Sequence, residues 1–196
     1  MEPTRERLVD AATRLLDEGG PAAVTLREVG RLAGVSHNAP YKHFTDKEDL
    51  LAAIAARELR SSDRTTPTHG ADELMRMMTA YARRARKYPE RFKLTFGRWS
   101  SGSPELATTA NAARQRLVDA VRRAQDAGEL PAGDPERLAS LIHAVAHGAA
   151  DLAISGHLAK RGKGHADPED LINDLLTHLR PSHHSAERRH ANRRSQ

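Results

Sequence analysis

The chain has 196 residues, 38% of them hydrophobic and 29% charged, which suits one domain or two small ones at about 100–200 residues each. It contains no cysteine, so disulfides, thiolate metal sites and a cysteine nucleophile are excluded. No apolar run approaches the ~20 residues that span a bilayer, and we expect a soluble, cytoplasmic protein without a membrane partner. The net charge of +5 favours a polyanionic partner such as nucleic acid.

Aromatic residues make up only 4% of the chain. The core must therefore consist mainly of Leu, Ala and Val, a composition that favours helices over strands. Apolar residues recur at helical spacing between Leu8 and Leu16 and predict a first helix over Arg5–Glu18. Thr4 is placed to cap this helix, and Gly19-Gly20-Pro21 to end it.

The second and third predicted helices form a helix-turn-helix pattern. Thr25, with Glu28 three residues later, is a capping-box arrangement at the start of the second helix. Gly34 ends that helix in the left-handed conformation that glycine favours. Ser36 then caps a short third helix that runs to about His43. In such a motif the second of the two helices enters the major groove of DNA.

The third helix has an apolar back and a polar front, which suits insertion into a groove. A fourth helix is predicted over Lys47–Leu59, after a cap at Thr45 or Asp46. A lysine in the first turn of a helix is poorly placed for the helix dipole. Lys47 therefore predicts a phosphate at that position.

The rest of the chain predicts five further helices and two irregular segments. The helices cover Asp72–Tyr88, Glu90–Phe96, Glu105–Ala127, Pro135–Leu158 and Pro168–Leu179. The polar stretch Ser61–Gly70 is predicted as a linker or a frayed helix end, and the basic tail from Pro181 onward as disordered. We expect an all-α protein of about nine helices, with a DNA-binding domain in residues 1–58, a helical domain in 59–180 and a tail in 181–196.

The segment from Thr25 to Leu51 resembles the DNA-binding domain of the tetracycline-repressor (TetR) family. The resemblance extends over roughly residues 4–58. It rests on an ordered set of motifs: Ala33-Gly34-Val35-Ser36, then Tyr41 and Phe44, then Lys47-Glu48 with Leu50-Leu51. An ordered set of this length is far more specific than a single short motif.

The resemblance implies roles for individual residues. The residues that would face base edges or nearby phosphates are Ser36, His37, Asn38 and Ala39. Those that would grip the DNA backbone are Thr25, Arg27, Tyr41, Lys42, His43 and Lys47. An asparagine can bond adenine in a bidentate manner, and an alanine methyl can contact the methyl of thymine.

Two residues depart from the family pattern. Gly30 stands where the family usually has alanine, which costs about 1 kcal/mol of helix propensity. Pro40 lies inside the recognition helix and lacks an N–H, but it falls near the first turn, where the loss is small. We expect the helix to survive, at an angle in the groove that the sequence does not fix.

The C-terminal half resembles one subtype of the same family, marked by a Trp-His-Gly signature. This chain keeps His147-Gly148 and has Ala146 in the tryptophan position. Small residues are frequent in Leu138–Leu158, so this helix can approach another closely. Together with Leu171–Leu179 it would form a four-helix bundle across a homodimer, as in the family.

Candidate ligand-binding residues in this half are Tyr81, Phe92, Phe96, Trp99, His143 and His147. Packing in the core explains the apolar members about equally well. His143, His147 and Asp151 share one helix stripe that could hold a metal, but nothing in the sequence completes such a site, so we predict no metal and no cofactor.

The leading hypothesis is a homodimeric transcription factor, most simply a repressor that a small-molecule effector releases from a palindromic operator. No catalytic motif supports an enzyme built around the histidine stripe. A constitutive DNA-binding protein would share the first 58 residues and lack a ligand cavity in residues 72–180. The effector, the operator and the regulated genes cannot be read from the sequence.

Overall fold

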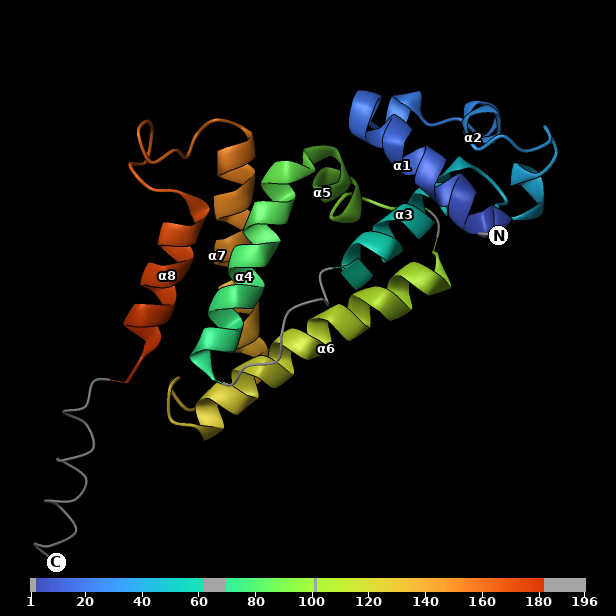
Figure 1. Ribbon diagram of the computed structural model, residues 1–196. Coiled ribbons are helices and arrows are strands. Elements are labelled where there is room, and N and C mark those ends of the chain that lie inside the picture. Colours follow the sequence, from blue (N-terminus) through green and yellow to red (C-terminus); the bar gives the residue numbers. More distant parts are fainter. Residues whose placement is uncertain (1–2, 62–69, 101, 182–196) are drawn as a thin grey trace, which may run out of the picture. The chain divides into compact units, whose positions relative to one another are not determined.

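The computed structural model describes residues 3–61, 70–100 and 102–181. This part of the chain contains eight α-helices, one 3-10 helix and no strand (Figure 1). The elements are α1 (Thr4–Ala23), α2 (Leu26–Leu32), η1 (Pro40–Lys42), α3 (Lys47–Ser61), α4 (Ala71–Lys87), α5 (Pro89–Thr95), α6 (Pro104–Asp126), α7 (Pro135–Ile154) and α8 (Pro168–Leu179). The all-α prediction is confirmed. Most of the predicted linker and all but the first residue of the tail lie outside the described residues.

The chain divides into two compact units. The first unit comprises Met1–Arg64 and Arg83–Gln115, and the second comprises Thr65–Ala82 and Arg116–Gln196. Helices α4 and α6 each contribute residues to both units. None of the described helices is long and apolar enough to cross a membrane.

The core of the first unit forms where α1, α3 and α5 pack against one another and α2 packs against α1 (Figure 1). Its largest fully buried side chains include Leu8, Leu16, Phe44, Leu50 and Ile54. The predicted apolar stripes of the first and fourth helices supply most of these residues. Full burial of each such side chain contributes roughly 1.5–3 kcal/mol, so these contacts hold the short, polar helix-turn-helix segment in place.

Two of the predicted helix caps in the first unit are present, and a third is not. The Thr25 hydroxyl accepts a hydrogen bond from the Glu28 amide at 3.2 Å, and the Asp46 carboxylate accepts one from the Asp49 amide at 2.8 Å. The predicted cap at Thr4 is wrong, because Thr4 is already helical and Pro3 precedes it without a side-chain cap.

The Gly19-Gly20 pair breaks α1 as predicted, but the chain resumes a helical turn beyond it. Gly19 and Gly20 have non-helical backbone angles, and Gly20 has φ +66°. Pro21 then lies inside the final turn, which ends at Ala23. Proline is tolerated there because its fixed φ suits the start of a helical turn.

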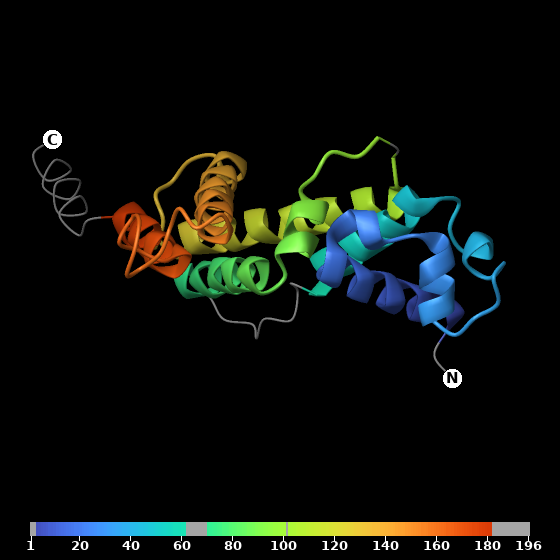
Figure 2. The same ribbon diagram turned by 90° about the horizontal axis from the view of Figure 1, so that it is seen from above.

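The second unit includes α7 and α8, which pack against each other (Figure 2). Asp134 and Asp167 cap the two helices through their carboxylates. Helix α7 ends at Ile154, four residues before the predicted end at Leu158. The reason is Gly156, which adopts φ +74° and lets the amides of the next two residues turn back onto the Leu152 carbonyl.

Candidate DNA-binding surface

A tight turn joins α2 to η1 and sets the geometry of the candidate DNA-binding surface. Gly34 has φ +62°, the left-handed conformation predicted for it. The Val35 amide donates to the Gly30 carbonyl at 3.1 Å, and the partly buried Val35 side chain packs against the core of the first unit. The turn is therefore anchored from the inside, while the residues that follow it face outward.

The predicted third helix, Ser36–His43, is much shorter in the structure. Only Pro40–Lys42 is helical, as the 3-10 helix η1. The proline nitrogen carries no hydrogen and cannot donate to the Ser36 carbonyl. The Ala39 amide donates to that carbonyl instead, at 2.9 Å, and closes a tight turn. The expectation that the helix survives Pro40 is therefore wrong.

This short element still separates an inner face from an outer face. Pro40 and Phe44 are buried, whereas Tyr41 is 54% exposed. The His37 ring lies edge-on to the Tyr41 ring, with 6.2 Å between centroids. Of the ten predicted DNA contacts, Ala39 and Lys47 are half-buried and the other eight are exposed: Thr25, Arg27, Ser36, His37, Asn38, Tyr41, Lys42 and His43.

Two arginines of α1, which the sequence did not single out, support this surface. The Arg7 guanidinium donates to the Ala33 carbonyl at 2.5 Å and to the Gly34 carbonyl at 3.3 Å. The Arg5 guanidinium lies 5.3 Å from the centroid of the Phe44 ring. Both contacts join residues far apart in the sequence, so no local pattern could have revealed them.

The two departures from the family pattern contact each other. A Cβ atom placed on Gly30 would lie 3.0 Å from Pro40 Cγ, closer than nine in ten Cβ contacts in proteins. Gly30 and Pro40 are both buried. The absence of a side chain at Gly30 therefore makes room for the proline ring that shapes η1.

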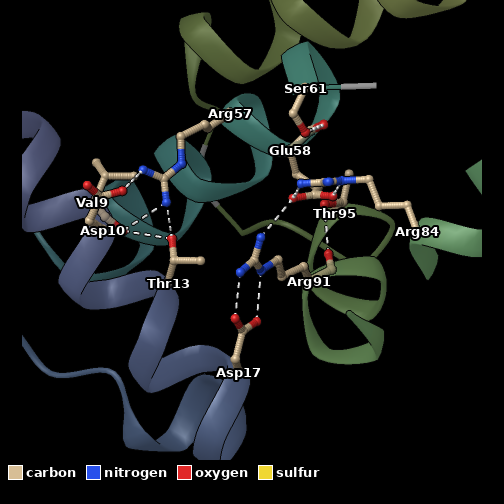
Figure 3. Close-up of polar contacts among 10 residues, drawn as sticks. All are labelled: Val9, Asp10, Thr13, Asp17, Arg57, Glu58, Ser61, Arg84, Arg91 and Thr95. Atoms are coloured by element: carbon tan, nitrogen blue, oxygen red, sulfur yellow. Dashed lines mark hydrogen bonds and ion pairs between the residues drawn. The ribbon is translucent and has the colours of Figure 1, made fainter. Parts of the chain in front are cut away.

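A network of ion pairs ties α5 and the last turn of α4 to α1 and α3 (Figure 3). Arg91 donates to both carboxylate oxygens of Asp17, at 2.8 and 2.5 Å, and lies 3.6 Å from Glu58. Arg84 also pairs with Glu58, through two hydrogen bonds. The hydrogen bonds with Asp17 raise the pKa of Arg91. Glu58 thus links two arginines to the helix that begins at Lys47.

Three of the six candidate ligand residues gather in the second unit. The Tyr81 hydroxyl lies 2.8 Å from Nδ1 of His147, and the Tyr81 and His143 rings meet edge-on with 5.5 Å between centroids. Burial raises the pKa of Tyr81 above its ordinary value and lowers that of His147. The phenol therefore keeps its proton and can donate it to a neutral imidazole.

The other three candidates belong to the first unit. Phe92 is buried and contacts Phe96, with 5.3 Å between ring centroids. Trp99 is partly buried against the core of the first unit. Each of these three aromatic residues therefore has neighbours in the first unit.

The predicted histidine stripe comprises His143, His147 and Asp151 of α7. Within the described ranges, no group of three or more His, Cys, Asp or Glu side chains is arranged to hold a metal ion. Asp151, the third member of the predicted stripe, is exposed.

Comparisons with known proteins match both halves of the chain. The family model for bacterial regulatory proteins of the tetR family matches residues 8–54, and that for the tetracyclin repressor-like C-terminal domain matches residues 74–179. The chain is 48% identical over 54 residues to the HTH-type transcriptional regulator BetI of Rhizobium meliloti. It is 30% identical over 91 residues to the HTH-type transcriptional repressor AcnR of Corynebacterium diphtheriae.

These two sequence matches span 27% and 46% of this chain, and 27% and 48% of the curated relatives, so the chain aligns with about a quarter to a half of each relative. Similarity of fold extends further. A protein of unknown function from Rhodococcus sp. RHA1 has a TM-score of 0.75 at 27% identity, covering 91% of this chain and 94% of that one. FadR from Bacillus subtilis, solved in complex with stearoyl-CoA, has a TM-score of 0.65 at 17% identity, covering 89% and 96%.

Proposed function

Because the chain belongs to the TetR family of DNA-binding transcriptional regulators, we propose that it is a homodimeric repressor released from a palindromic operator by a small-molecule effector. One observation carries this proposal. The helix-turn-helix segment has a buried inner face and exposes eight of the ten side chains predicted to contact DNA. A surface of this kind suits a groove and a phosphate backbone better than an enzyme's reaction centre.

Within this surface we assign two kinds of contact. Asn38 and its neighbours Ser36, His37 and Ala39 lie in the exposed turn before η1 and would read base edges. The remaining residues would hold phosphates: Thr25, Arg27, Tyr41, Lys42, His43 and Lys47. The tight turn at Ser36–Ala39 places the base-reading residues before η1 rather than along a full recognition helix.

The interface of the homodimer would consist of helix α7 together with helix α8. Two large apolar residues of α7, Leu141 and Leu152, are 47% and 45% exposed. Gly148 lies between them on the same stripe, and a Cβ there would meet nothing within 4 Å. An exposed apolar stripe with a small residue at its centre suits close packing against a second copy. Two copies would present two recognition elements to successive major grooves, which requires a palindromic site.

The effector would bind at the cluster of Tyr81, His143 and His147, which offers two imidazoles and a phenol to a polar ligand group. Tyr81 lies one helical turn before Arg84, which joins the ion-pair network around Glu58. An effector that favours a different placement of α4 would therefore act on α3 through the pair of Arg84 with Glu58. It would lower the fraction of protein molecules in the conformation that binds DNA.

Selection of random DNA fragments on the purified protein at near-physiological salt tests the proposal. Recovery of a palindrome is the expected result, and retention of DNA without a shared sequence would refute it. Asn38→Ala should then cost about 1–3 kcal/mol at its own base pair and relax the preference there. Lys47→Ala should instead weaken binding to all sequences and lower the salt slope by about one phosphate contact. An equal loss on every sequence for Asn38→Ala would contradict its assignment to base reading.

A further inference from the structure

An open hollow of about 600 Å³ lies in the first unit beside the first turn of α3. One wall is α3 itself, and another is formed by α5 and the connection that follows it. The lining combines apolar side chains with charged ones of both signs: Leu51, Leu94 and Trp99 with Lys47, Lys93, Arg98, Glu48 and Glu90. Lys47 therefore contributes both to the proposed DNA-binding surface and to this hollow.

The connection that carries Arg98 is fixed to α3 by specific contacts. The Ser100 amide donates to the Glu48 carboxylate at 2.6 Å, and the Ser100 hydroxyl also bonds that carboxylate. Trp99 packs against the core of the first unit. Arg98, next to these two residues, is exposed. Its backbone is thus held beside the start of α3, so Arg98 moves with the DNA-binding unit.

Two of the cations that line the hollow, Lys47 and Arg98, are available to bind an anion. Glu90 accepts a hydrogen bond from Lys93 at 2.9 Å, and Glu48 accepts those from Ser100. Neither Lys47 nor Arg98 forms an ion pair with any residue that the structure describes. The lining therefore has three cations and two carboxylates, a net charge of +1, and two of its cations have no ion pair among the described residues, which suits an anionic partner.

We propose that Arg98 binds the phosphate backbone of DNA, so that the contact proposed at Lys47 continues onto the connection between α5 and α6. The proposal rests on the proposed function. It favours DNA over a free anion because the hollow is continuous with the DNA-binding surface through Lys47. Phosphates follow one another every ~3.4 Å of axis along each strand, so one strand can offer phosphates to both cations. A guanidinium is well suited to bind a phosphate through two parallel hydrogen bonds.

The test compares Arg98→Ala with Arg161→Ala. Arg161 is exposed in the second unit, and its replacement removes the same single charge. The affinity of each protein for the selected operator and for a scrambled duplex is measured between 50 and 200 mM salt. Arg98→Ala should lower the salt slope by about 0.9, so the ratio of wild-type to variant affinity falls about threefold over this range. The loss should be the same on both duplexes, and Arg161→Ala should change neither slope.

An unchanged salt slope in Arg98→Ala overturns the proposal, and so does a change no larger than that in Arg161→Ala. Lys47→Ala, measured in the same series, separates this failure from failure of the proposed function. A lower slope for Lys47→Ala together with an unchanged slope for Arg98→Ala would leave the regulator in place and refute only the added contact. Circular dichroism of each variant confirms that it is folded.

Discussion

Adding one methyl group at Gly30 should destabilise the first unit, although the same change stabilises most helices. The new Cβ would lie 3.0 Å from Pro40 Cγ, 3.5 Å from Pro40 Cδ and 3.9 Å from Val35 Cγ2. The proline ring cannot rotate out of the way, because it is closed onto the backbone and Pro40 is buried at the first position of η1.

Two effects of opposite sign determine the size of the change. Alanine in place of glycine inside a helix gains ~1 kcal/mol, whereas forcing a methyl group into a packed interior costs ~1–3 kcal/mol. We expect Gly30→Ala to lower the free energy of unfolding by up to ~2 kcal/mol. In a Pro40→Ala background the crowding ring atoms are gone, and the same change should raise that free energy by ~1 kcal/mol.

A double-mutant cycle measures this coupling directly. Urea unfolding of the wild type, the two single variants and the double variant is followed at one protein concentration. Trp99 is the only tryptophan of the chain and packs against the core of the first unit, so its fluorescence reports unfolding of the unit that contains both positions. The expected coupling free energy is about 1–3 kcal/mol.

The cycle also has a clear refuting result. If Gly30→Ala stabilises the wild-type protein and the Pro40→Ala variant by the same amount, the proline ring does not crowd Gly30. If Gly30→Ala destabilises the wild-type protein and the Pro40→Ala variant equally, the crowding comes from another neighbour such as Val35. Either outcome would show that the two departures from the family pattern are independent, and that Gly30 does not make room for η1.

Three further predictions concern the ion-pair network, the histidine cluster and the dimer. Glu58→Gln should lower the free energy of unfolding by about 1–3 kcal/mol, because Arg84 loses hydrogen bonds to a charged group and Arg91 loses an ion pair. Asp119→Asn, which breaks the pair of the half-buried Asp119 with Arg122 on the same helix, is the control in urea unfolding, and an equal loss in the two variants would contradict this. Burial lowers the pKa of His147 below its unfolded value, so the unfolded chain binds more protons and stability falls as the pH drops below about 6.5. His147→Asn should therefore flatten the curve of Tm against pH below that value. A curve identical to that of the wild type would refute this role of His147. Leu152→Glu should shift the protein from dimer to monomer in sedimentation, and a persistent dimer would remove α7 from the interface.

Much of the first unit could be predicted from the sequence because its signals are local. Thr25 and Asp46 cap their helices by bonding amides three residues later, and Gly34 takes the left-handed conformation that glycine permits. The apolar stripes of the first and fourth helices are buried as expected. The failures are also local in origin: Pro40 shortened the recognition helix, and Gly156 ended α7 early.

The sequence by itself determined the helical class, the family and the residues that face outward from the helix-turn-helix. Hydrogen bonds and apolar spacing within a few residues encode these features. Only the tertiary structure decided that Arg7 supports the turn, that Gly30 accommodates Pro40 and that Arg98 stands beside α3. Each of these contacts joins separate helices or loops, and depends on the angle and distance at which they pack. Neither quantity is set by the residues of one segment.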